Sequence, residues 1–169
     1  MIRFGDAKNG QQLIDSGFKY VALYDSSCAF PTARSVELHF ASPQKRWITQ
    51  ACDPKSSIID FEAYTADYND PTDLQNWLDQ RERLKSARGS WIYCDLSNTP
   101  LVAQYVDGRA FKWWIATLDN TRRSRSELCA LMLDWGCPTA LAAPGLIAAN
   151  QWGTNGDYDT SVCFVDADW

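Results

Sequence analysis

Asp60 and Glu62 form the clearest chemical signal in the sequence. They stand two residues apart in the apolar run Ser57-Ile58-Ile59-Asp60-Phe61-Glu62, and residues two apart in a strand point to the same face of a sheet. Two carboxyl groups in one partly buried place raise each other's pKa, so one keeps a proton beside an ionised partner. Cleavage of a glycosidic bond requires this arrangement. A structural pair, bonded to neighbouring amides or an arginine, is the alternative interpretation.

The composition excludes several other kinds of chemistry. The chain has 169 residues, a net charge of −5 and a single histidine, His39. An acidic chain without a lysine-rich stripe is not expected to bind nucleic acid. The six cysteines form no C-x-x-C pair, and a Ser-His-Asp triad would have to use His39. We therefore expect no metal site and no cofactor, and we look to carboxylates for catalysis.

The elements that must position these acids follow a regular alternation of strands and helices. Eight β-rich runs cover residues 2–5, 20–24, 46–50, 57–62, 91–95, 113–118, 147–152 and 158–165. Helical patterns begin at Asp70-Pro71, Thr99-Pro100 and Ser124 and end at Gly89, Gly108 and Gly136, and shorter ones cover 11–16 and 32–41. This alternation favours an α/β fold with a parallel sheet.

Eight strands favour a closed barrel over an open, doubly wound sheet. The segment 5–10, Gly-Asp-Ala-Lys-Asn-Gly, does not fit the dinucleotide fingerprint. A typical (β/α)8 chain has about 250 residues, so some helices must be missing here. We therefore predict one domain over residues 1–169, a compact TIM-like (β/α) barrel of eight strands with reduced helices.

The loop 153–157 predicts how the barrel closes. It is too short for a parallel crossover, which needs a dozen or more residues, so the last two strands should form a hairpin. The final strand then runs antiparallel, and Asp159 near its start lies on the rim where the earlier strands end.

Acidic residues recur at the predicted carboxyl ends of the strands, where barrel enzymes hold their active sites. They are Asp6, Asp25, Asp60 with Glu62, Asp95, Asp119 and Asp159. Aspartate is also common in loops and helix caps, which is the alternative for any one of them. Tyr64, Tyr93 and two tryptophans of late strands, Trp114 and Trp152, offer flat rings for sugar faces, although core packing is the usual role of tryptophan.

Three segments resemble the family 25 glycoside hydrolases and related domains of bacterial and phage proteins. They are I-I-D-F-E, W-I-A-T-L-D and A-N-Q-W-G-T-N-G-D-Y-D-T-S, and the resemblance covers the chain from Ser57 onward. It implies an N-acetylmuramidase that cuts peptidoglycan, on a flattened barrel of five β/α units followed by three strands. The region from Tyr24 to Ser57 departs from the family, because it is much shorter and has no clear counterpart of the family's Tyr-His-Phe strand.

The resemblance also implies roles for individual residues. Glu62 would be the general acid, Asp60 its charged partner, and Asp159 and Asp6 the carboxylates of the last and first strands. Trp114 and Trp152 would line the glycan groove; the other candidate substrate-binding residues are Tyr64, Tyr93, Asp119 and Gln151.

Three functions remain open at this stage. The first is a glycosidase acting on cell-wall peptidoglycan, and the second is a non-catalytic phage virion subunit, in a minor tail or surface position, that uses the barrel for structure or host glycan binding. The third is an intracellular α/β domain with an unrelated small-molecule site.

The N-terminus has no apolar h-region, and Asp134, Pro138 and Pro144 interrupt the longest apolar stretch, so we expect no signal peptide and no membrane insertion. The expected partners are cell-wall glycan and other virion proteins, and the expected site of synthesis is the cytoplasm, followed by virion assembly or release at lysis.

Overall fold

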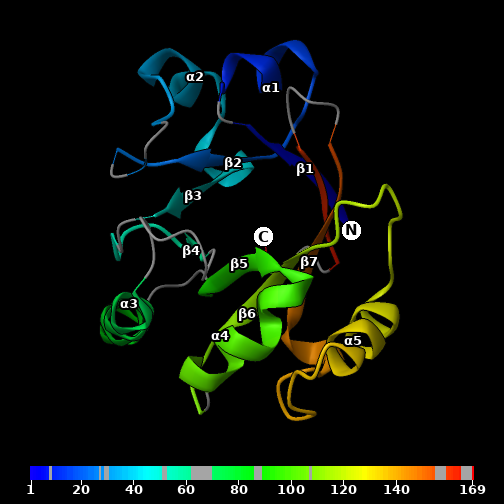
Figure 1. The fold of residues 1–169 in the computed structure, drawn as a ribbon. Coiled ribbons are helices and arrows are strands. Elements are labelled where there is room, and N and C mark those ends of the chain that lie inside the picture. The colour runs from blue at the N-terminus through cyan, green and yellow to red at the C-terminus, as the bar shows by residue number, and fades with distance from the viewer. Residues whose placement is uncertain are drawn as a thin grey trace.

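In a computed structural model of the chain, eight strands within the described residues close into a barrel, with neighbours in sequence order (Figure 1). The structure describes residues 1–7, 9–26, 28, 31–50, 53–61, 70–85, 89–106, 108–154, 159–164 and 169. The strands are β1 (Ile2–Asp6), β2 (Val21–Tyr24), β3 (Lys45–Thr49), β4 (Ile58–Asp60), β5 (Trp91–Asp95), β6 (Lys112–Ala116), β7 (Ile147–Thr154) and β8 (Asp159–Cys163). The predicted α/β barrel is confirmed.

Helices lie around the outside of the barrel (Figure 1). Those in the described part of the chain are α1 (Gln11–Asp15), α2 (Arg34–His39), α3 (Pro71–Leu84), α4 (Thr99–Val106) and α5 (Arg125–Asp134), with short 3-10 turns at Ser42–Gln44, Leu96–Asn98 and Pro144–Leu146. The predicted start signals are present. Asp70 caps α3 by accepting a hydrogen bond from the backbone N–H of Thr72 (2.8 Å), and Ser124 and Glu127 form a capping box at α5.

The last strand closes the barrel in the opposite direction from the others. Strands β1 to β7 pair in parallel, whereas β8 is antiparallel to both β7 and β1. The hairpin predicted from the short loop is therefore confirmed. In the β1–β8 register Asp6 lies opposite Asp159, so the two acids share one rim.

The connection from β3 to β4 departs from a series of five consecutive β/α units. It consists of residues 50–57, and its described part, Gln50 and 53–57, contains no helix. Eight residues can make this parallel crossover because β4 is only three residues long and an extended chain spans about 3.3 Å per residue. Helices therefore follow β1, β2, β4, β5 and β6 among the described residues.

Apolar side chains pack on both sides of the strands. One cluster fills the barrel interior and includes Phe4, Ile58, Trp91 and Trp114. Two clusters lie between the strands and the helices, one against α3, α4 and α5 and one against α1 and α2. Because side chains alternate along a strand, each strand serves the interior and an outer layer at once.

The C-terminal Trp169 plugs the barrel at the amino ends of the parallel strands. Its ring lies 4.7 Å from that of Phe4, 5.7 Å from Tyr20 and 6.2 Å from Trp91. Its indole N–H donates to the carbonyl of Pro43 (3.0 Å), and the chain end lies within the ring of strands in Figure 1.

Two further features bear on the predictions. In the part of the chain that the structure describes, no helix has the length and apolar character needed to cross a bilayer. The cysteines described as free thiols, Cys28, Cys94, Cys129, Cys137 and Cys163, are all buried, so they pack as small hydrophobic groups.

Candidate active site

Three of the predicted carboxylates meet at the carboxyl end of the barrel. Asp6 ends β1, Asp60 ends β4 and Asp159 begins the antiparallel β8. Phe4 and Ile58, two residues before the first two acids, belong to the interior cluster, so the alternation of strand side chains turns Asp6 and Asp60 inward as well. Because every second side chain of a strand points to the same face, the acids lie directly after the aromatic interior of the barrel.

Asp6 carries the strongest electrostatic signal of this group. It is 4% exposed, and burial raises its pKa well above 3.8, with further increases from the negative charges of Asp159 and Asp60. No hydrogen bond reaches its Oδ1 atom from the described residues. Asp6 is thus a carboxyl group that holds its proton more tightly than an exposed aspartate does.

Asp60 is buried as well, at 6% exposure. Its Oδ2 atom accepts a hydrogen bond from Nε2 of Gln50 (2.9 Å), which fixes the orientation of the carboxyl group. Gln50 was not among the residues predicted from the sequence. The available signal was its position two residues after the inward-facing Ile48.

Two tyrosines lie beside the acids. Tyr24 and Tyr93, with Ile48 and Trp114, line a gap next to Asp6 and Asp60 that has no room for a water-sized molecule. Burial raises the pKa of Tyr24, and the charges of Asp60 and Asp6 raise it further, so its hydroxyl stays a hydrogen-bond donor. Tyr93 was predicted from the sequence, whereas Tyr24 was not.

The two predicted tryptophans occupy different environments. Trp114 is fully buried, packs at 5.0 Å from Phe4 and 4.8 Å from Tyr93, and donates its indole N–H to Oγ of Ser161 (3.0 Å). It packs beside the acids and does not present an exposed face to a glycan. Trp152 is half-buried and lies where the pairing of β7 with β8 becomes irregular, so its predicted role remains a prediction.

Gln151 is a buried amide on β7. It is fully buried, and neither its Nε2 nor its Oε1 atom forms a hydrogen bond to a described residue. It pairs in register with Ser161, whose hydroxyl faces the interior. The preceding residue, Asn150, is equally buried but well bonded: Nδ2 donates to the carbonyl of Ile115 (3.1 Å), and Oδ1 accepts from the backbone N–H of Arg123 (3.1 Å). An unsatisfied buried polar group costs about 1–3 kcal/mol, which marks Gln151 as a candidate ligand contact.

Asp119 is held in a separate loop interaction. Arg123 donates from one guanidinium nitrogen to Oδ1 (2.7 Å) and from another to Oδ2, and the backbone N–H of Thr121 also donates to Oδ1. These bonds lower the pKa of Asp119 to about 2. Asp119 does not line the gap between Asp6 and Asp60.

The remaining predicted residues are scattered or not described. Asp95 is exposed at the end of β5, and Asp25 is buried and accepts a hydrogen bond from Oγ of Ser56 (2.5 Å). Glu62 and Tyr64 lie outside the described residues. Among the residues that are described, no group of three His, Cys, Asp or Glu side chains is placed to hold a metal ion.

Comparisons with known proteins add little to this geometry. No protein-family model matches the chain, and no curated protein matches it. A crystal structure of an uncharacterized protein from B. stearothermophilus is similar to 99% of this chain over 99% of its own, at 10% sequence identity and a TM-score of 0.48. Similarity at this level carries no conclusion about function.

Proposed function

We propose that this protein is a glycosidase that acts on the glycan of bacterial cell walls. The observation that carries the proposal is Asp6, a buried carboxyl group with a raised pKa, next to Asp60 and Asp159 at the carboxyl end of an α/β barrel. A cluster of carboxyl groups in which burial raises one pKa suits glycosidic cleavage. The choice of cell-wall glycan rests on the resemblance of three sequence segments to family 25.

The proposed reaction divides the work among the acids. Glu62 donates a proton to the leaving oxygen as the bond from that oxygen to the anomeric carbon breaks. Asp60, oriented by Gln50, or Asp159 stabilises the positive charge on the sugar ring or directs the attack of water, which supplies the new hydroxyl group. Asp6 in its neutral form limits the repulsion among the carboxylates.

Hydrolysis of purified cell walls tests this proposal, with new reducing ends as the readout. Glu62→Gln and Asp60→Asn should each lower the rate by about a hundredfold or more, because general acid catalysis contributes roughly 10²–10⁴. Asp15→Asn is the matched control, since Asp15 is an exposed carboxylate on α1 that bonds only to Gln11 among the described residues. An unchanged rate in Glu62→Gln would remove its assignment as the acid.

A non-catalytic phage virion subunit is the second candidate. The observation that favours it is the tight packing beside the acids, since the gap lined by Asp6 and Asp60 has no room for a water-sized molecule. In this case the protein, made in the cytoplasm and assembled into the virion, would bind host glycan without producing reducing ends. Stoichiometric copies on purified particles, with no hydrolysis by the wild-type protein, would favour this candidate over the glycosidase.

A further inference from the structure

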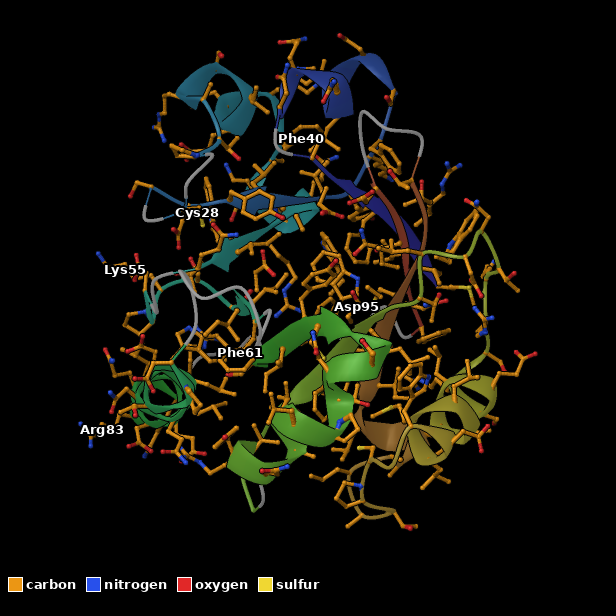
Figure 2. The ribbon with its side chains drawn as sticks, viewed as in Figure 1. Cys28, Phe40, Lys55, Phe61, Arg83 and Asp95 are labelled. Atoms are coloured by element: carbon orange, nitrogen blue, oxygen red, sulfur yellow. The ribbon has the colours of Figure 1, made fainter. Side chains whose placement is uncertain are left out.

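A second cavity lies beside the barrel, on the side of β2 and β3. Its volume is about 310 Å³, which is within the usual range for small-molecule sites. Its lining comes from the end of β2, from α2 and β3, and from the β3–β4 connection. In Figure 2 this side of the molecule carries the labelled residues Cys28 and Lys55. The elements around it are short: α2 has six residues, and no helix occurs in the described part of the β3–β4 connection.

The lining combines one flat ring with polar groups. Trp47 is half-buried on β3 and supplies the apolar surface. Thr32 and Ser56 bring hydroxyl groups, and Asp53 brings a carboxylate. A sugar ring has this same combination, with an apolar C–H face that packs on an indole ring and hydroxyl groups around its edge that bond to acceptors and donors.

The polar groups differ in how far the protein already uses them. Glu37 is paired with Arg34 and lies 3.7 Å from Nζ of Lys45. Asp53 accepts the backbone N–H of Lys55 at Oδ1 (2.9 Å), while its Oδ2 atom has no hydrogen-bond partner among the described residues. Asp53 therefore keeps an acceptor for a ligand hydroxyl group.

The charge around the cavity favours an uncharged ligand at Asp53. Three carboxylates, Asp25, Glu37 and Asp53, and one lysine, Lys55, belong to the lining, but Glu37 is already paired with Arg34 and Lys45. A ligand carboxylate placed against Asp53 would be repelled, because like charges in a partly buried site are costly to bring together. An uncharged hydroxylated ring meets no such penalty.

Tyr24 connects this cavity with the acidic rim. The same residue lines the outer cavity and the inner gap beside Asp6 and Asp60. A ring bound in the outer cavity would therefore lie one side chain away from the carboxylates, separated from them by the Tyr24 ring.

We propose that this outer cavity binds one uncharged sugar ring, packed on Trp47 and hydrogen-bonded by Asp53, as a site distinct from the acidic rim. The site goes beyond the proposed function, because binding there requires no hydrolysis. It would hold a glycan chain against the outside of the barrel next to the rim.

Titration of the full-length protein with triacetylchitotriose tests the site, followed by tryptophan fluorescence and calorimetry. The wild type should bind saturably, and Trp47→Ala and Asp53→Asn should each weaken binding by about tenfold, equivalent to roughly 1.4 kcal/mol. Trp135→Ala is the matched control, since Trp135 is 55% exposed at the end of α5, and it should bind like the wild type. Trigalacturonic acid should bind more weakly than the neutral trisaccharide.

Several outcomes would overturn the proposal. They are no binding of the neutral trisaccharide up to roughly 10 mM, equal affinity in wild type and Asp53→Asn, or tighter binding of the anionic trisaccharide. Asp53→Asn decides the matter even if Trp47→Ala fails to fold, because the Asp53 side chain is only partly buried.

The same proteins separate this proposal from the glycosidase. Glu62→Gln should still bind the trisaccharide while cell-wall hydrolysis is lost. Binding through Trp47 by a wild type that hydrolyses no walls would overturn the proposed function and support the site. Wall hydrolysis by the wild type, combined with an unaltered trisaccharide affinity in Asp53→Asn, would support the proposed function and overturn the site.

Discussion

The two ends of the barrel differ in how favourable the contacts of their buried side chains are. At the amino end the aromatic rings of Phe4, Trp91 and Trp169 pack against one another. At the carboxyl end β1 presents Asp6 and β7 presents Gln151; Oδ1 of Asp6 and both amide atoms of Gln151 lack hydrogen-bond partners among the described residues. One end therefore holds the fold together, and the other tolerates unfavourable burial, as sites kept for a ligand commonly do.

Buried charge shows the same contrast. At the amino end Arg46 is fully buried, yet its Nε donates to Oγ of Ser57 (3.0 Å) and a terminal nitrogen donates to the carbonyl of Gly89 (2.7 Å). Its guanidinium group also stacks 3.8 Å from the ring centre of Trp91. The fold therefore supplies hydrogen bonds even to a buried cation at one end. At the other end it supplies none from the described residues to the Gln151 amide, which supports a role for Gln151 in contacting a ligand.

Removal of the Trp169 ring from the amino end should lower the free energy of unfolding more than any other change proposed here. Trp169→Ala should lower the free energy of unfolding by about 3–5 kcal/mol, because it leaves a cavity among three aromatic rings. Urea unfolding measures this change. The exposed Trp135 provides the control, and Trp135→Ala should alter stability by no more than about 0.5 kcal/mol. Similar losses in both variants would contradict the role given to the plug.

Substitutions of the two adjacent amides on β7 should change the free energy of unfolding in opposite directions. Asn150→Leu should lower the free energy of unfolding by about 2 kcal/mol, because it leaves the carbonyl of Ile115 and the N–H of Arg123 without their bonds. Gln151→Met should raise it by about 1 kcal/mol, because it removes an unsatisfied buried amide. Urea unfolding of the two variants side by side provides the comparison, and destabilisation in both would show that Gln151 has a partner in the folded protein.

Asp6→Asn should change how the free energy of unfolding depends on pH. The folded-state pKa of Asp6 is raised above 3.8, so its contribution to stability is fully present below that pH and is lost as the pH rises through the folded-state value. Each unit of the raised pKa corresponds to about 1.4 kcal/mol. The free energy of unfolding, measured from pH 4 to pH 8, should fall less steeply in Asp6→Asn than in the wild type. Parallel curves would show that burial does not perturb this carboxyl group.

Local patterns in the sequence predicted most of the architecture. The eight apolar runs, the capping signals at Asp70 and Ser124 and the short loop before Asp159 are each encoded within a few residues, and the structure has the corresponding strands, helices and hairpin. The gathering of Asp6, Asp60 and Asp159 followed from the topology, because the ends of parallel strands share one rim.

Features that depend on contacts between distant residues were not predicted. The position of Trp169 depends on rings contributed by β1 and β5, and Gln50 could be linked to Asp60 only after the pairing of β3 with β4 was known. Asp119 was grouped with the rim acids because it follows a strand, but its bonds to Arg123 depend on the course of the loop, which strand periodicity does not specify.

The antiparallel closing strand has a consequence for synthesis of the protein. Strand β8 pairs with β1 along all five residues of each strand, so β1, which is made before the other strands of the barrel, lacks one of its two neighbours until residues 159–163 have been made. Because long-range strand pairing is slow and leaves open edges that invite aggregation, a ribosome-bound chain ending before Asp159 should remain open to chaperones and proteases. Barrel closure therefore waits until β8 has been made, and translation stalled between β7 and β8 should leave the nascent chain protease-sensitive.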